Sequence, residues 1–323
     1  ALLLTAVFLA GEIRSRRRFQ AGFALAIALA AGPFLWRWAY FGDPLPNTYY
    51  CKRADLSYDL AEGAAYVKGW LLGPHGALLA FGLLGAVPVR PPLGAARLAS
   101  LGTVLAFLAF ALWAGGDFVE GHRFLVPAVP TLAAVAAVGL RRLAPEGAPS
   151  PRRFLPAFAA LGLAGWLLST TGGLRRAAHL AHLWERRWDA VGRTLGERLA
   201  PDCSVALAAI GAIGYRSGLP VVDMLGLTDR HIARRPASSM PGLKGHQKFD
   251  GAYVLSRRPD VVILANTITI PPGDPDGEIR PLPWERDIWE DPAFGRDYER
   301  VVFPVPGGFP LVCFRRRDSA CGR

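Results

Sequence analysis

The chain has 323 residues, of which 51% are hydrophobic and 20% are charged, and its formal net charge is +11. A chain of this length usually forms more than one domain. The positive charge would suit nucleic acid, but the arginines cluster between apolar stretches, where membrane topology places them, so nucleic acid is not an expected partner. Apolar residues concentrate before Thr170 and charged residues become frequent after it, which predicts a membrane half and a water-soluble half.

The chain begins inside an apolar stretch, at Ala1, with no methionine and no basic residue before it. A signal peptide normally has basic residues ahead of its apolar core. We therefore interpret the sequence as the carboxy-terminal part of a longer protein.

Six apolar stretches predict membrane-spanning helices, the first of them partial. A spanning helix needs about 20 mainly apolar residues, because the hydrocarbon core is about 30 Å thick and each residue rises about 1.5 Å. The stretches are 1–10, 20–38, 69–88, 96–114, 124–140 and 154–170. They define a predicted transmembrane helical domain over residues 1–170.

The loops between these stretches alternate in charge. Every second loop is rich in arginine: Arg14, Arg16, Arg17, Arg18, Arg90, Arg97, Arg141, Arg142, Arg152 and Arg153. The positive-inside rule assigns such loops to the cytoplasm. The loops at 39–68 and 115–123 and everything after the sixth stretch are then extracytoplasmic, which predicts a multi-pass protein of a bacterial inner membrane.

Residues 171–323 have the pattern of an extracytoplasmic α/β domain. Amphipathic spacing predicts a helix over 173–200, and 250–258 also has a helical pattern. Strands are predicted over 203–210, 219–227, 259–266, 298–305 and 309–316, the last two as an antiparallel pair, and 270–293 is predicted to be a loop. The predicted fold is therefore a multi-spanning α-helical membrane domain followed by a soluble α/β domain with a mixed sheet.

The cysteines are Cys51, Cys203, Cys313 and Cys321. They form no CxxC pair and have no histidine at metal-ligand spacing, so no metal site is predicted from them. An extracytoplasmic domain could contain one disulfide. Two buried free thiols at positions 203 and 313 are equally compatible, because both positions fall in strand-like stretches.

The first outer loop contains FGDPLPNTYYCK, residues 41–52. We interpret Asp43, Asn47, Tyr50 and Lys52 as a rim that binds a lipid-linked sugar, with the lysine facing phosphate and the aromatic ring facing the sugar. The alternative is an interfacial loop, stiffened by its prolines and anchored by its tyrosines.

The second outer loop contains GGDFVEGHRF and gathers Asp117, Glu120, His122 and Arg123. Ionisable groups at a membrane surface are costly unless they are paired or functional. In the functional interpretation His122 and Arg123 bind phosphate oxygens, and Asp117 orients an acceptor hydroxyl or a metal. In the alternative, Asp117 and Arg123 pair with each other.

The soluble half has two further polar segments, DMLGLTDRHIAR at 223–234 and KGHQKFD at 244–250. Five polar residues cluster there and are candidates for lining a cleft that holds an acceptor glycan: Asp223, Asp229, His231, His246 and Lys248. The alternative is that Asp229 or Thr228 simply begins a helix as its N-cap.

The segments FGDPLPNTYYCK, GGDFVEGHRFLVPAVP and DMLGLTDRHIAR, in this order, resemble one family of proteins. The family comprises the GT-C fold glycosyltransferases that use lipid-linked sugars, and the nearest likeness is to bacterial arabinofuranosyltransferase-like membrane proteins. The resemblance implies a hexosyl- or pentosyltransferase that moves a sugar from a polyprenyl-phosphate donor to a glycan of the cell envelope. Its implied partners are the lipid-linked donor, the acceptor glycan and membrane lipids, with no required cofactor and a divalent cation left open.

In that family the main acidic residues lie in the first outer loop near the amino terminus. The resemblance therefore implies that the main catalytic base precedes this chain, and Asp117 is only a candidate for that role. It also implies a donor pocket formed by Asp43, Lys52, Asp117, His122 and Arg123.

Two other functions stay open. A lipid-linked sugar transporter or flippase would place polar groups near the middle of the bilayer, whereas here they lie at the outer ends of the predicted helices. A non-catalytic membrane anchor with a periplasmic interaction domain would need no cluster such as Asp117 to Arg123.

Overall fold

The computed structural model describes residues 16–73, 76, 95–117, 121–135, 178, 185–238, 245–264, 279–306 and 309–321. The chain divides into two compact units. Unit 1 consists of Ala1–Leu45 and Asp55–Ala177, and unit 2 consists of Pro46–Ala54 and Ala178–Arg323. A short amino-terminal segment thus belongs to the same unit as the carboxy-terminal half.

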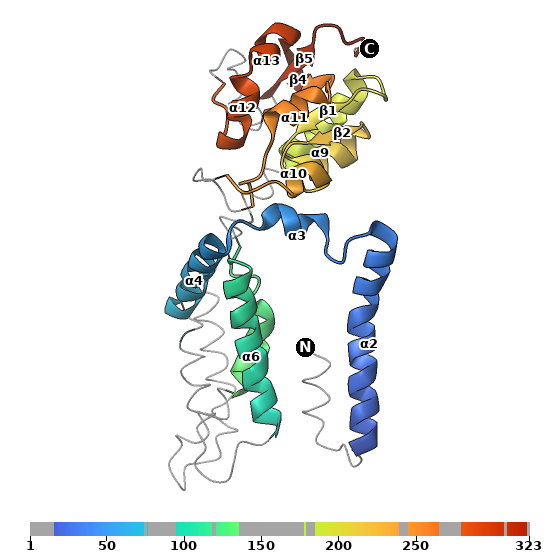
Figure 1. The fold of residues 1–323 in the computed structure, drawn as a ribbon. Helices are drawn as coiled ribbons and strands as arrows, with labels where there is room; N and C mark the ends of the chain where they lie inside the picture. The colour runs from blue at the N-terminus through green and yellow to red at the C-terminus, as the bar shows by residue number, and fades with distance from the viewer. Residues whose placement is uncertain are drawn as a thin grey trace. The chain divides into compact units, whose positions relative to one another are not determined.

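The described part of unit 1 is helical. Its elements are α2 (Arg16–Phe41), α4 (Leu56–Leu72), α6 (Ala95–Trp113) and the 3₁₀ turn η1 (Val126–Ala128), drawn in blue to green in Figure 1. The carboxylate of Asp55 begins α4 by accepting the Tyr58 N–H at 2.9 Å. Helices α4 and α6 approach closely at Gly63, where a Cβ would lie 2.3 Å from the Leu112 carbonyl oxygen. A larger residue there would push the helices apart.

The prediction of a multi-spanning membrane domain is wrong for the part of the chain that the structure describes. There, one helix, Gln20–Phe41, is long and apolar enough to cross a membrane. Where the predicted spans 96–114 and 124–140 are described, their apolar helices Ala99–Trp113 and Val126–Val135 are shorter than that.

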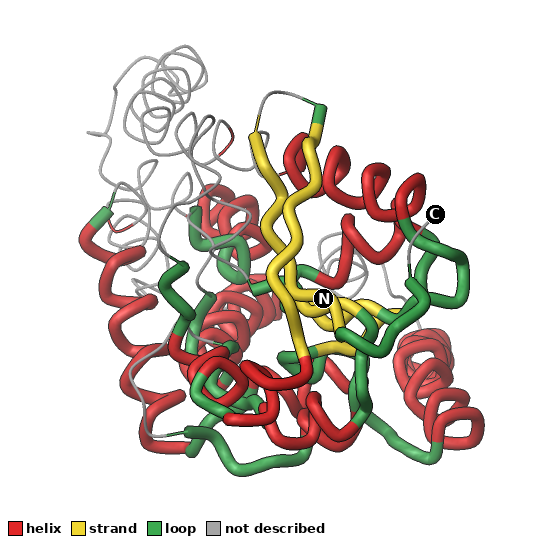
Figure 2. Tube along the Cα trace, turned by 90° about the horizontal axis from the view of Figure 1, so that it is seen from above, coloured by secondary structure: helices red, strands yellow, loops and turns green. Residues whose placement is uncertain are grey.

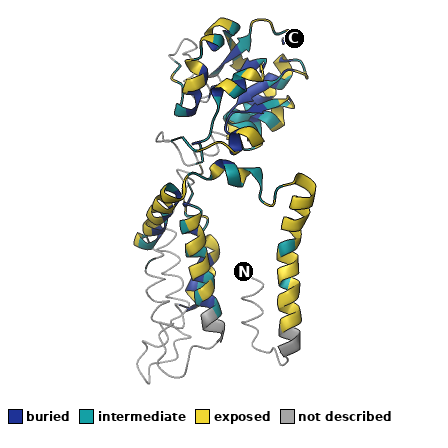
Figure 3. Cartoon of the chain, viewed as in Figure 1, coloured by how far each residue is buried: buried dark blue, intermediate teal, exposed yellow. Residues whose placement is uncertain are grey.

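Side-chain packing explains why apolar composition was misleading. Apolar residues of α4, α6 and the segment after it bury one another: Val67, Trp70, Val104, Ala111, Leu125 and Leu132. These residues are apolar because they form a protein core, whereas the span within α2 has none of its residues buried (Figure 3). The region 39–68, predicted as a loop, contains α3 (Asn47–Lys52) and most of α4. Predicted spans 1–10 and 154–170, and most of 69–88, lie outside the described residues.

Unit 2 is built on a mixed sheet with strand order β2-β1-β3-β5-β4. The strands are β1 (Val205–Leu207), β2 (Val221–Asp223), β3 (Val261–Val262), β4 (Tyr298–Val305) and β5 (Phe309–Arg316). Strands β1, β2 and β3 are parallel, and β5 runs antiparallel to both β3 and β4. Figure 2 shows the β4–β5 pair as the longest strands of the sheet.

Helices cover both faces of this sheet, because its central strands are apolar on both sides. Val205 and Leu207 face a core with Val191 and Leu195 of the helix over 185–198, which α9 (Ile210–Ser217) completes. Ala206, between them, faces the opposite core. That second face is covered by α10 (Arg230–Ala233), α11 (Gly251–Ser256), α12 (Arg286–Trp289) and α13 (Pro292–Asp297), with the 3₁₀ turn η4 (Pro283–Glu285) before α12.

Asp260 joins the starts of two strands to the end of a third. Its carboxylate accepts the Ser204 N–H at 2.9 Å, the Ser204 hydroxyl at 2.8 Å and the Ser319 hydroxyl at 2.8 Å. It also pairs with Arg316 at 2.7 Å. Burial alone would raise the pKa of Asp260, but these donors outweigh it and lower the pKa to about 2.

A disulfide joins Cys203, just before β1, to Cys321, after β5. The two cysteines are 118 positions apart in the sequence, and their Cα atoms are 5.8 Å apart. Cys51 and Cys313 are buried free thiols, and burial raises their pKa values to about 11 and about 12. The sequence was compatible with two buried free thiols, at positions 203 and 313. Cys313 is a free thiol, whereas Cys203 is in the disulfide.

Asp260→Asn should destabilise unit 2 near neutral pH by about 1–2 kcal/mol, because a carboxylate with a depressed pKa stabilises the folded state once ionised. That contribution is complete above the unfolded pKa of about 3.8 and disappears as pH falls through the folded value of about 2. Thermal unfolding of the full chain in detergent should show a gap between wild type and variant that closes over this window. Equal midpoints at pH 7 would contradict the assignment.

Candidate functional site

Asp223, at the end of β2, organises the loop that follows it. Its side chain is buried, and one oxygen accepts the N–H groups of Leu225 at 2.9 Å and Gly226 at 3.0 Å. The other oxygen accepts the Thr228 N–H at 2.6 Å and the Thr228 hydroxyl at 3.0 Å. Both oxygens therefore hold the loop in shape, and Asp223 acts as a structural residue.

The side-chain amide of Asn47 binds the loop that Asp223 shapes. Its nitrogen donates to the carbonyl oxygens of Gly226 at 2.8 Å, Leu227 at 3.3 Å and Asp229 at 3.1 Å. Asn47 is the first residue of α3, and about 180 residues separate it from these partners. The contact brings together two of the three segments on which the family resemblance rests.

Cations fasten the rest of α3 to the same region. The ammonium group of Lys248 donates to the carbonyl of Tyr50 at 2.8 Å and to that of Ala233 at 3.0 Å. The guanidinium of Arg234 lies 3.8 Å from the centre of the Tyr50 ring. We call residues 47–52, 223–234 and 245–248 together the α3 platform.

Two further residues of α3 complete the platform. The aliphatic part of Lys52 lies beside Gly245, where a Cβ would be 3.4 Å from the lysine Cγ. Cys51 is 1% exposed. Burial and then the negative charge of Asp223 raise the pKa of its thiol, so the thiol is neutral. Tyr50 and Lys52 thus contact protein groups of unit 2.

Asp229 begins α10 as its N-cap, which agrees with the simpler of the two interpretations of this segment. One carboxylate oxygen accepts the Ile232 N–H at 3.0 Å, and the other accepts the Tyr253 hydroxyl at 2.9 Å. Another candidate in this half, His246, has its ring 4.8 Å from that of Trp284.

A histidine–carboxylate pair joins His231 of the platform to Asp250, two residues after the platform's last segment. Nε2 of His231 is 3.0 Å from a carboxylate oxygen of Asp250, which also pairs with Arg235. The His231 ring stacks on Tyr253 with centroids 4.1 Å apart. The His231 side chain is 48% exposed and that of Asp250 is 12% exposed.

This pair has the arrangement used for proton transfer. Burial alone would raise the pKa of Asp250, but hydrogen bonds from His231 and the Tyr253 N–H outweigh it and lower the pKa. An ionised carboxylate that holds one ring nitrogen orients a histidine for work as an acid or base. The residues that the sequence singles out for the acceptor cleft include His231 but omit Asp250. Both lie in the two polar segments that the sequence marks out, but 19 positions apart, without a recognisable spacing.

In unit 1, Asp117 and Arg123 form an ion pair, with Asp117 5% and Arg123 54% exposed. This pairing is the alternative that the sequence analysis gives for the second outer loop, in which the two residues bind each other and not a substrate. The ring of His122 lies 4.8 Å from that of Tyr66, and burial lowers the pKa of His122, so it is neutral at pH 7 and does not offer phosphate a positive charge. Asp43 is half-buried and also belongs to unit 1.

Within the described ranges, no group of three or more His, Cys, Asp or Glu side chains is arranged to hold a metal ion. Glu120, named with the second outer loop, lies outside those ranges.

Asn47→Asp should destabilise the platform more than Asn47→Ala. Alanine leaves three carbonyl groups without this donor, a loss of about 1–3 kcal/mol, whereas aspartate adds a negative charge facing the same oxygens. Thr48→Ala, an exposed change on the same helix, is the matched control and should leave the midpoint of thermal unfolding unchanged. Equal midpoints for the two Asn47 variants would show that the amide does not bind these carbonyls.

Comparison with known proteins adds one finding. Residues 176–319 match the model of a family described as a domain of unknown function, DUF8728. The match covers less than half of the chain and includes all five strands of unit 2, but not α3. No curated protein matches the chain, and no solved structure matches it.

Proposed function

We propose that this chain is a membrane-bound glycosyltransferase that takes a sugar from a polyprenyl-phosphate donor and transfers it to a glycan bound by unit 2. The observation that supports the proposal is the α3 platform. The segments 41–52 and 223–234, which resemble the same family of transferases, meet there through Asn47. Two motifs that meet in space in this way behave as parts of one site. The proposal does not require a multi-spanning domain.

Membrane attachment is assigned to α2. Its apolar stretch ends in aromatic side chains that are more than half exposed: Trp36, Trp38, Tyr40 and Phe41. Aromatic residues of this kind are enriched where a helix leaves the hydrocarbon for the headgroups.

We assign unit 2 to the extracytoplasmic side of the membrane. The disulfide between Cys203 and Cys321 supports this, because disulfides persist in oxidising compartments and are rare in the cytosol. The acceptor glycans of a cell envelope lie on that side.

The chemistry needs a base for the acceptor hydroxyl and cations for the leaving phosphate. In the transfer, the bond from the anomeric carbon to the phosphate oxygen breaks, and a bond to the acceptor oxygen forms. The acceptor proton passes to the base, and polyprenyl phosphate leaves. We assign the base to His231, oriented by Asp250, because Asp117, Asp223 and Asp229 already bind other protein groups. Lys52, in the same unit as His231, is the cation proposed for the phosphate.

Because these carboxylates already bind protein groups, a second candidate function is also supported. It is a non-catalytic protein that displays unit 2 as an interaction domain. Three of the acidic residues predicted for substrate binding serve the fold or an ion pair. A purely structural domain would show this pattern as well. The two candidates differ in whether the chain turns over a donor.

Membranes that contain the full chain should transfer radiolabelled sugar from polyprenyl-phosphate arabinose or polyprenyl-phosphate mannose to an envelope glycan. His231→Ala and Asp250→Asn should each lower the rate by about 100-fold, the usual contribution of a general base. Asparagine can still cap α11, so the second variant tests charge and not folding.

Asp189→Asn is the control, since it breaks an exposed pair with Arg193 on the helix over 185–198. Its transfer rate should equal that of wild type. If neither donor is used by the wild type, the interaction domain is the better description. If transfer occurs but is unaffected by His231→Ala, the base is another residue.

A membrane-impermeant maleimide should label Tyr215→Cys in intact spheroplasts. Position 215 is 81% exposed, and all four native cysteines are either buried or in the disulfide, so the introduced thiol gives the signal. Labelling should be equally strong before and after lysis. Labelling that appears only after lysis would place unit 2 in the cytoplasm and remove the proposed acceptor.

A further inference from the structure

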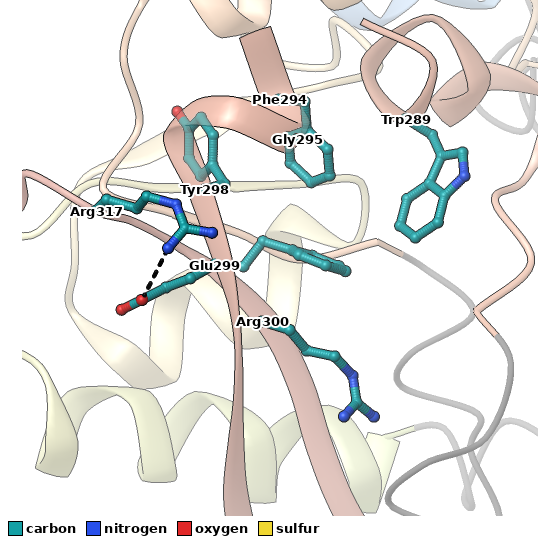
Figure 4. Close-up of a pocket in the computed structure, with 8 residues that line it drawn as sticks. Trp289, Phe294, Gly295, Tyr298, Glu299, Arg300 and Arg317 are labelled. Carbon is teal, nitrogen blue, oxygen red and sulfur yellow. Dashed lines mark ion pairs between the residues drawn. The ribbon is translucent and has the colours of Figure 1, made fainter. Parts of the chain in front are cut away.

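A hollow opens in unit 2 where α12 and α13 meet the ends of β4 and β5 (Figure 4). Its volume is about 240 Å³, and its lining contains aromatic rings and charged groups. Pockets for drug-sized molecules are usually about 300–1,000 Å³. This hollow is therefore of a size for a single small ring. None of its lining residues belongs to the α3 platform or to the His231–Asp250 pair.

The aromatic side of the hollow is a supported surface. Trp289 is 37% exposed, whereas Phe294 and Phe314 are almost fully buried. The Trp289 ring packs edge-on against Phe314 at 5.7 Å and lies 6.1 Å from Phe294. The buried rings thus hold one indole in place while part of it stays open to solvent.

The charged residues that line the hollow divide between the two faces of β4. Glu299 is held by Arg315 at 2.8 Å and by Arg317 at 3.5 Å. Arg317 also donates to the carbonyl of Arg296 at 3.1 Å. Arg300 lines the hollow and lies opposite Phe314 in the β4–β5 register, so its side chain is on the aromatic face, whereas Glu299 lies opposite Arg315 on the other face (Figure 4). The guanidinium N–H groups of Arg300 can donate to neighbouring hydroxyl groups.

We propose that this hollow is a carbohydrate subsite that binds one neutral sugar ring of the acceptor glycan. One face of a sugar ring carries polarised C–H groups, which suit the electron-rich face of an indole, and its edge carries hydroxyl groups, which can accept from the Arg300 guanidinium on the same face of the sheet. The choice of a sugar as ligand rests on the proposed function. The placement and chemistry of the hollow do not.

Gly295 provides a direct way to fill the hollow. It lines the space, and a Cβ built there meets no atom within 4 Å. Gly295→Leu should therefore occupy the hollow without displacing the backbone. Trp289→Ala removes the aromatic surface instead, and Trp289→Phe keeps a smaller one.

The test is binding of neutral linear trisaccharides of glucose, mannose, galactose and arabinofuranose to the full chain in detergent, measured by saturation-transfer NMR and calorimetry. At least one should bind wild type. Trp289→Ala and Gly295→Leu should each weaken it by about tenfold or more, as expected for loss of a central aromatic contact. Trp289→Phe should weaken it less. Tyr215→Ala, at an exposed aromatic residue of α9, should bind as wild type does.

The inference is overturned if no trisaccharide binds, or if either Trp289→Ala or Gly295→Leu binds as wild type does. The transfer assay separates this failure from failure of the proposed function. Transfer that is insensitive to both substitutions removes only the subsite. Sugar binding that both substitutions abolish, in a chain that uses neither donor, removes only the transferase and leaves a carbohydrate-binding domain.

Discussion

The amide of Asn47 is the contact on which the α3 platform depends. Asp223 first fixes the loop after β2, so that the carbonyls of Gly226, Leu227 and Asp229 lie within reach of one donor. Lys248 then closes the other end of α3. Backbone carbonyls that are buried without a hydrogen-bond donor destabilise the fold. The loop supplies three carbonyl acceptors, and Asn47 of α3 supplies the donor. This explains why a six-residue helix from the first quarter of the chain belongs to the carboxy-terminal unit.

The regular part of unit 2 was predictable from local sequence. The β4–β5 pair was expected over 298–305 and 309–316, and its strands have these bounds. The predicted strand 219–227 is correct only over Val221–Asp223, because the Asp223 side chain turns the chain immediately afterwards. Helix α12 was missed within a predicted loop. It has four residues, too few for a helical period, and a proline begins the 3₁₀ turn before it.

The first half of the chain was harder to predict for a different physical reason. Apolar composition reports that a residue avoids water, but not whether lipid or protein replaces the water. Trp70 and Leu125 are buried by protein, while the aromatic residues near the end of α2 are exposed. One residue, Gly63, indicates that α4 packs against protein, since it permits the close approach of α4 to α6. The contact of Asn47 with the loop after β2 had no local signal, because it joins residues about 180 positions apart.

What each carboxylate already binds decides where acid–base chemistry is feasible. Asp223 is buried and accepts four hydrogen bonds, all of them from the loop that contacts α3. Asp229 is similarly committed to α10 and to Tyr253. Asp250 differs, because one of its partners is itself a group that exchanges protons and stands nearly half exposed. Under the proposed function, this is the reason to place the acid–base step at His231 and Asp250 among the described residues of unit 2.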